Sequence, residues 1–122
     1  MDEPVFKIRH VSEKATDRRW RVGYFFCPGC KNVHCVNIGP GVPPARLTWV
    51  FDENYVTPTI TSSVDVWWDE RVRVDGITRT VRKHCHFDLT EGVLKYHSDT
   101  NAHELAGKEV PLPPLPEWFV NS

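Results

Sequence analysis

Hydrophobic and polar residues alternate along much of the chain, which is the pattern of β-strands with one buried face. The alternation is clearest over residues 20–26, where large apolar side chains occupy every second position. Other strand-like segments are residues 5–8, 33–38, 47–51, 60–68, 72–74 and 77–80. The periodicity of a long amphipathic helix is absent from the sequence. The pattern therefore predicts a small, mostly β single domain of antiparallel hairpins.

Two short turns connect these segments. Asp75-Gly76 and Glu91-Gly92 are typical of two-residue hairpin loops that need positive φ. With Glu91-Gly92 as a loop, apolar residues pair on one face of the hairpin and opposite charges pair on the other. Cys85 then points toward the core, whereas His86 and His97 face each other on the outer side.

The last part of the chain predicts a helix and a tail. Asn101 and Glu104 have the spacing of a capping box, so we expect one short helix near the C-terminus, ending at Gly107. Residues 111–122 are rich in proline, and we expect this tail to pack against its own domain. We therefore expect residues 1–122 to form one domain, with a core of about residues 18–112.

Composition and charge narrow the class of protein. The chain has 122 residues, which fits one domain, and 40% of them are hydrophobic, enough for a core. The 15 Lys and Arg residues against 16 Asp and Glu give a net charge of −1, which excludes a histone-type nucleic-acid module and a polyacidic mimic. The sequence contains neither a membrane-spanning apolar run nor a signal peptide, so we expect a soluble, cytoplasmic protein.

Four cysteines, Cys27, Cys30, Cys35 and Cys85, carry the clearest chemical signal. In a reducing compartment, a close Cys-x-x-Cys pair indicates metal or redox chemistry rather than a disulfide. Cys27-Pro28-Gly29-Cys30 is a compact turn that directs two sulfurs and backbone N–H groups to one point, as in a zinc knuckle. A redox dithiol would begin a helix instead, and strand-like residues flank this turn on both sides. We therefore expect zinc, with a redox dithiol and a metal-free buried pair as the alternatives.

A structural zinc site needs four Cys or His ligands and no open position. Cys85 is the expected third ligand, because the hairpin register directs it toward the core. His103 is the expected fourth, since a short helix beginning near it can fold back over the sheet. His34, Cys35 and His86 are the other candidates for that position. The expected metal site is Cys27, Cys30, Cys85 and His103.

Two other interpretations of the polar residues stay open. His86, Asp99 and His103 lie close in sequence and could build a metal-dependent hydrolase site, although no H-E-x-x-H motif accompanies them. A group of cations near two tryptophans could bind single-stranded nucleic acid, but acidic residues lie among them, which favours a solvated charged hairpin. These residues are Arg71, Arg73, Arg79, Arg82 and Lys83, beside Trp67 and Trp68.

An ordered set of short motifs resembles a known family. The motifs are Cys27-Pro28-x-Cys30, Trp49-x-Phe51, Pro58-Thr59 followed by Ser62-Ser63, Cys85-His86, Gly92, Asp99 and His103-x-Leu105-x-Gly107. In this order they resemble the small, largely uncharacterised proteins of phages and prophages that carry a CPxC zinc knuckle. Relatives of those proteins occur near bacterial ubiquitin-like conjugation genes. The resemblance spans residues 24–112 and implies Cys27, Cys30, Cys85 and His103 as metal residues, with His34, His86 and Asp99 nearby.

The resemblance implies a fold more than an activity. We expect a small intracellular zinc-binding protein that acts as a phage-type accessory or protein-interaction module in the host cytoplasm. Its partner would be a host or phage protein, and an enzymatic role is less favoured. The alternatives are a metal-dependent hydrolase and a nucleic-acid-binding protein of the zinc-ribbon type.

Overall fold

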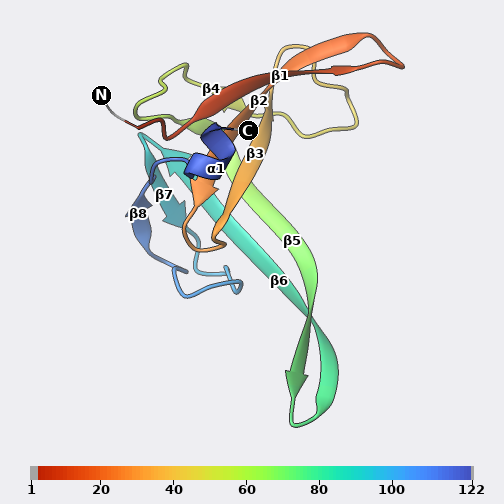
Figure 1. Cartoon of the computed structure of the whole chain (residues 1–122), viewed down its shortest axis with the longest axis vertical. Coiled ribbons are helices and arrows are strands. Elements are labelled where there is room, and N and C mark those ends of the chain that lie inside the picture. The colour runs from red at the N-terminus through yellow and green to blue at the C-terminus, as the bar shows by residue number, and fades with distance from the viewer. Residues whose placement is uncertain (1–2, 122) are drawn as a thin grey trace.

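Two antiparallel sheets make up the structure, a computed structural model that describes residues 3–121 (Figure 1). The three-stranded sheet has the order β1-β2-β3, formed by β1 (Lys7–Glu13), β2 (Arg18–Cys27) and β3 (Asn32–Ile38). The five-stranded sheet has the order β4-β5-β6-β7-β8, formed by β4 (Val50–Phe51), β5 (Ile60–Val74), β6 (Ile77–Thr90), β7 (Val93–Tyr96) and β8 (Glu109–Pro111). A short helix, α1 (Glu117–Val120), follows. Among the described residues, no helix has the length and apolar character that a membrane crossing requires. The predicted mostly β fold of antiparallel hairpins is confirmed.

A tight loop fixes the register between β6 and β7. Glu91 and Gly92 form it, with φ of 49° and 75°, as a two-residue turn requires. The predicted pairing is confirmed, since Leu89 lies opposite Leu94. Cys85 shares the inner face with these leucines and is fully buried.

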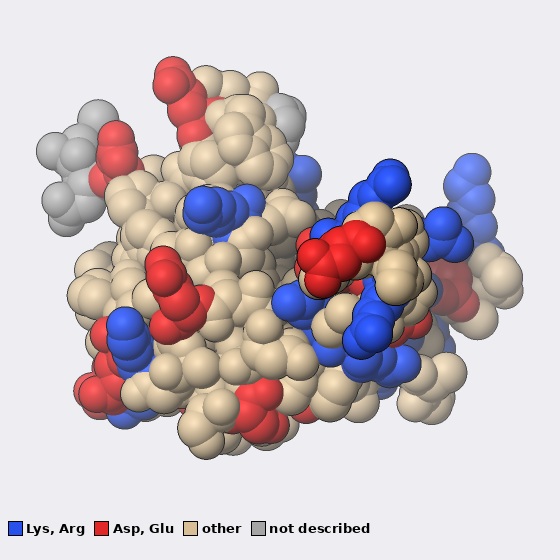
Figure 2. Space-filling model, turned by 90° about the horizontal axis from the view of Figure 1, so that it is seen from below, with Lys and Arg blue, Asp and Glu red and all other residues tan. Residues whose placement is uncertain are grey.

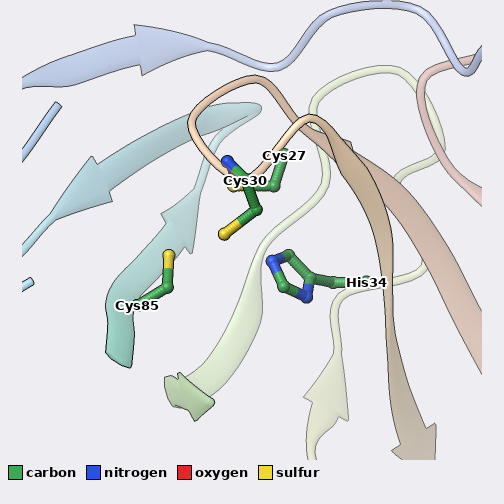
Figure 3. A group of neighbouring side chains, drawn as sticks. All are labelled: Cys27, Cys30, His34 and Cys85. Atoms are coloured by element: carbon green, nitrogen blue, oxygen red, sulfur yellow. Dashed lines mark hydrogen bonds between the residues drawn. The ribbon is translucent and has the colours of Figure 1, made fainter. Parts of the chain in front are cut away.

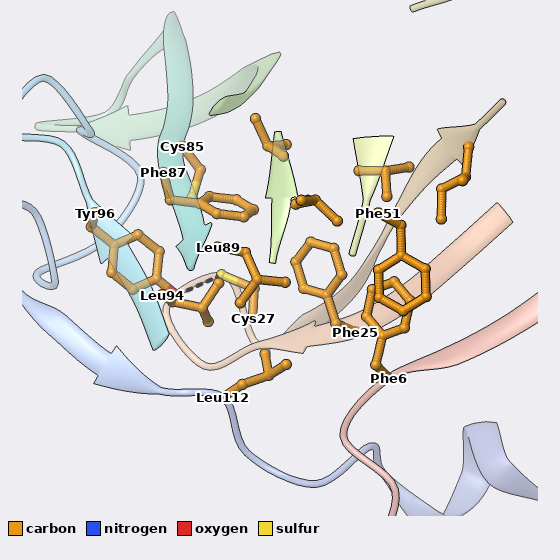
Figure 4. Close-up of a cluster of buried hydrophobic side chains, with 14 residues drawn as sticks. Phe6, Phe25, Cys27, Phe51, Cys85, Phe87, Leu89, Leu94, Tyr96 and Leu112 are labelled. Atoms are coloured by element: carbon orange, nitrogen blue, oxygen red, sulfur yellow. Dashed lines mark hydrogen bonds between the residues drawn. The ribbon is translucent and has the colours of Figure 1, made fainter. Parts of the chain in front are cut away.

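The hydrophobic core lies between the two sheets (Figure 4). Phe25 of β2 meets Phe87 of β6 edge to face, with 5.8 Å between the ring centroids, and both side chains are fully buried. Such aromatic pairs add to the stabilisation that burial provides. The other apolar members of the core are Phe6, Val36, Ile38, Phe51, Ile60, Val64, Leu89, Leu94, Tyr96 and Leu112. Cys27 and Cys85 lie in the same core, which keeps their sulfurs away from water.

The segment after β7 differs from the prediction. Residues 101–107 form turns and not a helix. The Asn101 side chain accepts a hydrogen bond from His84 N at 2.7 Å, and the N–H groups of Asn101 and Ala102 donate to His84 O. Because these groups bind β6, they are not available to start a helix. The short helix lies further on, at α1.

Both ends of the described chain contribute to the core. Leu112, Leu115 and Phe119 of the proline-rich tail are buried, and Leu115 N donates to Pro4 O at 2.8 Å. The tail therefore packs on its own domain, as predicted. Buried side chains reach beyond the expected core of residues 18–112 at both ends, since Phe6 is also buried.

The outer parts of β5 and β6 form a two-stranded ribbon (residues 69–82) that extends away from the two sheets (Figure 1). The sequence pattern divides this region into separate short strands, but the structure pairs it continuously. Polar residues interrupt the alternation here because both faces of the ribbon meet solvent. Acidic and basic side chains are interleaved at this end of the molecule (Figure 2), and Arg82 lies 3.9 Å from Asp69.

Candidate metal centre and candidate active site

Three cysteines and one histidine come together between the two sheets. Cys27 ends β2, Cys30 lies in the following turn, His34 lies in β3 and Cys85 lies in β6 (Figure 3). One ligand atom from each residue lies within 4.8 Å of those of the others. Thiolate sulfurs and an imidazole nitrogen form one of the usual ligand sets of structural zinc. The donor set and its spacing therefore fit a tetrahedral zinc ion.

The turn between β2 and β3 has the hydrogen bonds of a zinc knuckle. Cys30 N donates to Cys27 Sγ at 3.3 Å, and the Tyr96 hydroxyl lies 3.0 Å from the same sulfur. Hydrogen bonds from the Cys30 and Cys85 thiols hold the pKa of Cys27 well below its usual range, and the same contact with Cys27 raises the pKa of Cys85. The cluster thus favours negative charge on a sulfur, the form that binds a metal cation.

His34 is the fourth member of the cluster because of its place in β3. It lies on the same face of the strand as Val36 and Ile38, which are buried, so its ring points inward. The ring centroid lies 5.5 Å from that of Phe87, and Nε2 is buried with no hydrogen-bond partner among residues 3–121. A buried polar atom without a partner costs free energy unless a ligand satisfies it. The burial of His34 Nε2 without a partner is the observation that favours a bound metal.

His103, the expected fourth ligand, lies beside the cluster and outside it. Its Nε2 is 3.3 Å from Cys85 Sγ, and its Nδ1 accepts a hydrogen bond from Leu105 N at 3.2 Å. Since Nδ1 accepts, the neutral ring carries its proton on Nε2, which donates to the Cys85 sulfur and offers a metal no lone pair. The ring also fills the space above Gly29, where a Cβ would collide with it. This geometry makes His103 a hydrogen-bond donor to a ligand.

The other two candidate ligands point elsewhere. Cys35 follows His34 in β3, so it faces the opposite side of that strand and is exposed. His86 follows Cys85 in β6 and faces away from the core, as the hairpin register predicts. It belongs to a second cluster of polar side chains.

In this second cluster, His86 lies between a serine and an aspartate. Its Nε2 is 3.1 Å from Ser63 Oγ, and its Nδ1 is 3.2 Å from both carboxylate oxygens of Asp99. The sequence of atoms is that of a Ser-His-Asp triad. When Nδ1–H donates to Asp99, Nε2 is free to accept the proton of the Ser63 hydroxyl. Ser63 and His86 are partly buried, and the Asp99 side chain is 56% exposed.

The β5–β6 register places Ser63 on the same face of the sheet as His86, next to a bulge in β5. Residues 61–63 lie opposite Asp88 alone, because the β5–β6 register shifts at this point. Bulges are frequent next to active sites. The Trp49 indole N–H donates to Ser63 O at 3.2 Å and so holds the serine backbone.

The turn after β7 holds the histidine in place. Thr100 Oγ1 accepts a hydrogen bond from His86 N and donates one to His86 O, both at 3.0 Å. His97 N also donates to His86 O, at 2.8 Å, and the two imidazole rings stack with centroids 3.8 Å apart. The predicted opposition of His86 and His97 is therefore confirmed. Asp99 lies in the same turn, so one short segment positions both the histidine and its carboxylate.

A second histidine, His84, lies on the other side of Asp99. Its Nε2 is buried, lies 3.2 Å from Asp99 Oδ2 and has no aligned hydrogen bond within the described part of the chain. Trp67 stacks on this ring with centroids 3.9 Å apart. Partial desolvation raises the pKa of Asp99, but the neighbouring His84 and His86 rings outweigh this effect, so the pKa is lowered. Asp99 therefore stays a carboxylate at neutral pH.

The structure does not assemble the expected trio of His86, Asp99 and His103. His103 lies next to Cys85 on the core side of β6, whereas the other two residues lie on the outer side. Ser63 was not predicted as a site residue from the sequence, where it appears only within the Ser62-Ser63 motif. A signal for it exists, because extending the Asp75-Gly76 hairpin along its whole length brings residues 63–65 opposite His86 and its neighbours.

Ser63, His86 and Asp99 thus have the arrangement that defines the serine hydrolase class. Residues 3–97 match the family model of BubE, described as a bacterial ubiquitination-like system serine protease, and the chain belongs to this family. The matched range includes Ser63, His86 and the four clustered Cys and His residues. No curated protein and no solved structure matches the chain. The family agrees with the expected link to bacterial ubiquitin-like conjugation, and a phage or prophage origin stays a prediction.

Proposed function

We propose that this protein is a serine peptidase of a bacterial ubiquitination-like system. Ser63 is the nucleophile, His86 the general base, and Asp99 the residue that orients His86. The observation that carries the proposal is the continuous contact from Ser63 Oγ through His86 to Asp99, at 3.1 and 3.2 Å. The family description supports the same activity. The accessory role expected from the sequence, without catalysis, is the alternative.

The reaction follows from the two nitrogens of His86. Nε2 takes the proton of the Ser63 hydroxyl as Oγ attacks the carbonyl carbon of the scissile amide. The C–N bond then breaks, His86 gives the proton to the leaving amine, and the acyl group stays on Ser63 as an ester. Water then attacks the ester as His86 takes one of its protons, the bond from the acyl carbon to Oγ breaks, and His86 returns the proton to Ser63 as the carboxylic acid leaves. Asp99 accepts the hydrogen bond from Nδ1–H of His86 during both the formation and the hydrolysis of the ester, and it stabilises the imidazolium.

A structural zinc ion held by Cys27, Cys30, His34 and Cys85 forms the second part of the proposal. Four protein ligands leave no open position, so the ion would contribute stability and take no part in the reaction. Cys85 directly precedes His86 in β6. A metal that fixes Cys85 therefore also fixes the strand that carries the base.

The proposed substrate is a protein of the same conjugation system. The family description places relatives of this chain in a ubiquitination-like system, which supports a ubiquitin-like protein or its conjugate as the substrate class. The bond cleaved would be a peptide or isopeptide bond, since both have the amide carbonyl that Ser63 attacks.

Fluorophosphonate labelling tests the nucleophile without a known substrate. The zinc-loaded protein should react at Ser63, where an Oγ–P bond replaces the P–F bond, and peptide mass spectrometry should locate the adduct. Ser63→Ala should abolish labelling, and His86→Ala should slow it at least about 100-fold because the general base is lost. Ser62→Ala is the matched control, since it removes the neighbouring hydroxyl and should keep the wild-type rate.

Two results would contradict the proposal. Labelling that persists in Ser63→Ala, or a folded wild-type protein that is not labelled, would exclude Ser63 as the nucleophile and favour the accessory role. When labelling succeeds, a ubiquitin-like protein with a C-terminal reporter tests the substrate class. Wild-type protein should release the reporter, and Ser63→Ala should not.

A further inference from the structure

One edge of β5 is paired over a short distance only. β4 pairs with Ile60 and Thr61, and its ladder ends there. Ser63 follows two residues later. Among the described residues, no strand pairs with this side of β5 from Ser63 to Val74. The Trp49 indole N–H bonds to Ser63 O at 3.2 Å, so the uncovered edge begins directly after the proposed nucleophile.

The β5–β6 register determines which backbone groups this edge presents. A two-residue hairpin loop is closed by a hydrogen-bonded pair, here Val74 and Ile77, and such pairs alternate with non-hydrogen-bonded pairs along the ladder. Counting from the loop, Asp65 and Trp67 belong to non-hydrogen-bonded pairs. Their N–H and C=O groups therefore point away from β6 and toward the open edge.

Contacts of β6 verify this count independently. His86 and His84 are the partners of Asp65 and Trp67, so their backbone groups should also point away from β5. They do, since His86 O accepts a hydrogen bond from His97 N at 2.8 Å, on the β7 side. His84 O likewise accepts two hydrogen bonds from the turn after β7, from Asn101 N and Ala102 N. The edge groups of Asp65 and Trp67 have no such backbone partner within residues 3–121.

We propose that an extended segment of the protein substrate adds to this edge of β5 as a further strand and so brings its scissile carbonyl to Ser63. The proposal rests on the proposed function, because it places the substrate relative to that nucleophile. The N–H and C=O groups of Asp65 and Trp67 hold the segment through main-chain hydrogen bonds, a recognised mode of peptide binding. β4 occupies the same edge just before Ser63, so the substrate strand continues an existing ladder.

The side chains along the edge limit the length of this binding site. Asp65 and Trp67 share one face of β5, and Trp67 is 49% exposed while its ring stacks on His84. A substrate side chain on that face packs against an indole that is already held in place. Further out, Asp69 begins the charged ribbon, and charged edges disfavour strand addition. The site is therefore the short edge Asp65–Trp67.

Two covalent adducts of Ser63 separate backbone contacts from reactivity. Diisopropyl fluorophosphate gives a small adduct without peptide. A tripeptidyl diphenyl phosphonate gives an adduct that carries peptide backbone, and the reagent used is the fastest of a panel that varies the residue next to phosphorus. In this reaction the Oγ–P bond forms and one bond from phosphorus to phenoxide breaks. Phenol leaves with the serine proton. Amide hydrogen exchange at Asp65 and Trp67, measured by NMR, should be at least tenfold slower in the peptidyl adduct than in the small one.

A pair of proline variants tests the edge from the side of the protein. Asp65→Pro removes the outward N–H nearest Ser63 and no β5–β6 hydrogen bond. The measured quantity is the ratio of two labelling rates in one variant, that of the best tripeptidyl phosphonate over that of diisopropyl fluorophosphate. Asp65→Pro should lower this ratio at least tenfold. Thr80→Pro is the matched control, because its N–H points outward from the opposite edge of the hairpin, and it should leave this ratio unchanged.

The outcomes separate the two proposals. Slowed exchange in the peptidyl adduct, with a reduced ratio in Asp65→Pro alone, supports strand addition. Unchanged exchange in fully labelled protein overturns it and leaves Ser63 as the nucleophile. The proposal is also overturned if no tripeptidyl phosphonate of the panel labels Ser63 faster than diphenyl methylphosphonate, which has no peptide. Failure of diisopropyl fluorophosphate to label Ser63 overturns the proposed function, and the edge proposal with it.

Discussion

Cys85 and His86 are adjacent residues that belong to different centres. Consecutive strand residues point to opposite faces, so Cys85 faces the sulfurs in the core and His86 faces Ser63 on the outer side. Cys85 is fully buried, whereas His86 is only partly buried. A substitution of Cys85 should therefore lower the zinc content first, whereas a substitution of His86 should lower the reactivity of Ser63 first.

The two histidines near the sulfurs are expected to differ in their effect on zinc binding. His34→Ala removes the proposed fourth ligand and should leave the purified protein without its full zinc. His103→Ala removes only a hydrogen-bond donor to Cys85, so zinc should stay bound with an affinity lowered by about tenfold. Native mass spectrometry with elemental analysis measures zinc per chain, and chelator competition measures the affinity. The opposite result would make His103 the ligand and His34 a packed core residue.

The cysteines of the site could be predicted from local sequence patterns, and Ser63 could not. Cys27 and Cys30 have a diagnostic spacing, and Cys85 follows from the register of one hairpin. Ser63 lies in a strand without a G-x-S-x-G motif, so only the register of the long β5–β6 hairpin relates it to His86. Strand alternation indicates that His34 faces inward, but the choice between His34 and His103 depends on the three-dimensional position of each ring, which no local pattern encodes.

At the scale of elements, β6 connects the two centres and the ribbon. Its inner half carries Cys85 and His86, and its outer half pairs only with β5. The sequence predicts the hairpin loops well, because positive φ limits the residues that a loop can use. It predicts the strand lengths poorly, because solvent on both faces of the ribbon removes the alternation on which the prediction depends.

Removing the outer ribbon should leave the fold intact. The variant lacks residues 71–80, and an Asn-Gly loop joins Glu70 to Val81. Glu70 and Val81 form a hydrogen-bonded pair of the β5–β6 ladder, which is the kind of pair that closes a two-residue loop. Most deleted side chains are exposed, so the free energy of unfolding should change by less than about 1 kcal/mol. Denaturant unfolding and fluorophosphonate labelling check this. A loss of several kcal/mol would show that the ribbon stabilises the two sheets.

At the scale of the whole molecule, the proposed zinc ion joins the two sheets. Cys27 and His34 come from the three-stranded sheet, and Cys85 comes from the five-stranded sheet. A chain of this size buries a modest core, so a metal ion that joins its two sheets would contribute a large part of its stability. The same ion would hold the strand that carries His86 against the three-stranded sheet.

Zinc removal should therefore affect stability and reactivity together. A strong chelator should lower the free energy of unfolding by at least about 3 kcal/mol, or Tm by roughly 10 °C, and slow the labelling of Ser63 in parallel. Calorimetry and labelling rates measure the two effects, and added zinc should restore both. Replacement by cobalt(II) should give thiolate charge-transfer absorption as an independent sign of the cysteine ligands. Unchanged Tm and labelling after complete chelation would reduce the cluster to ordinary core packing.

The two-residue loop at the end of the ribbon also constrains how the gene can change in length. One added residue in each strand would put a non-hydrogen-bonded pair next to the loop, which Asp75-Gly76 does not suit. A residue added to one strand alone would turn that strand over relative to its partner and exchange its inner and outer faces. Evolution should therefore lengthen or shorten the ribbon by two residues per strand at a time. Insertions and deletions at this place in related genes should come in multiples of four codons.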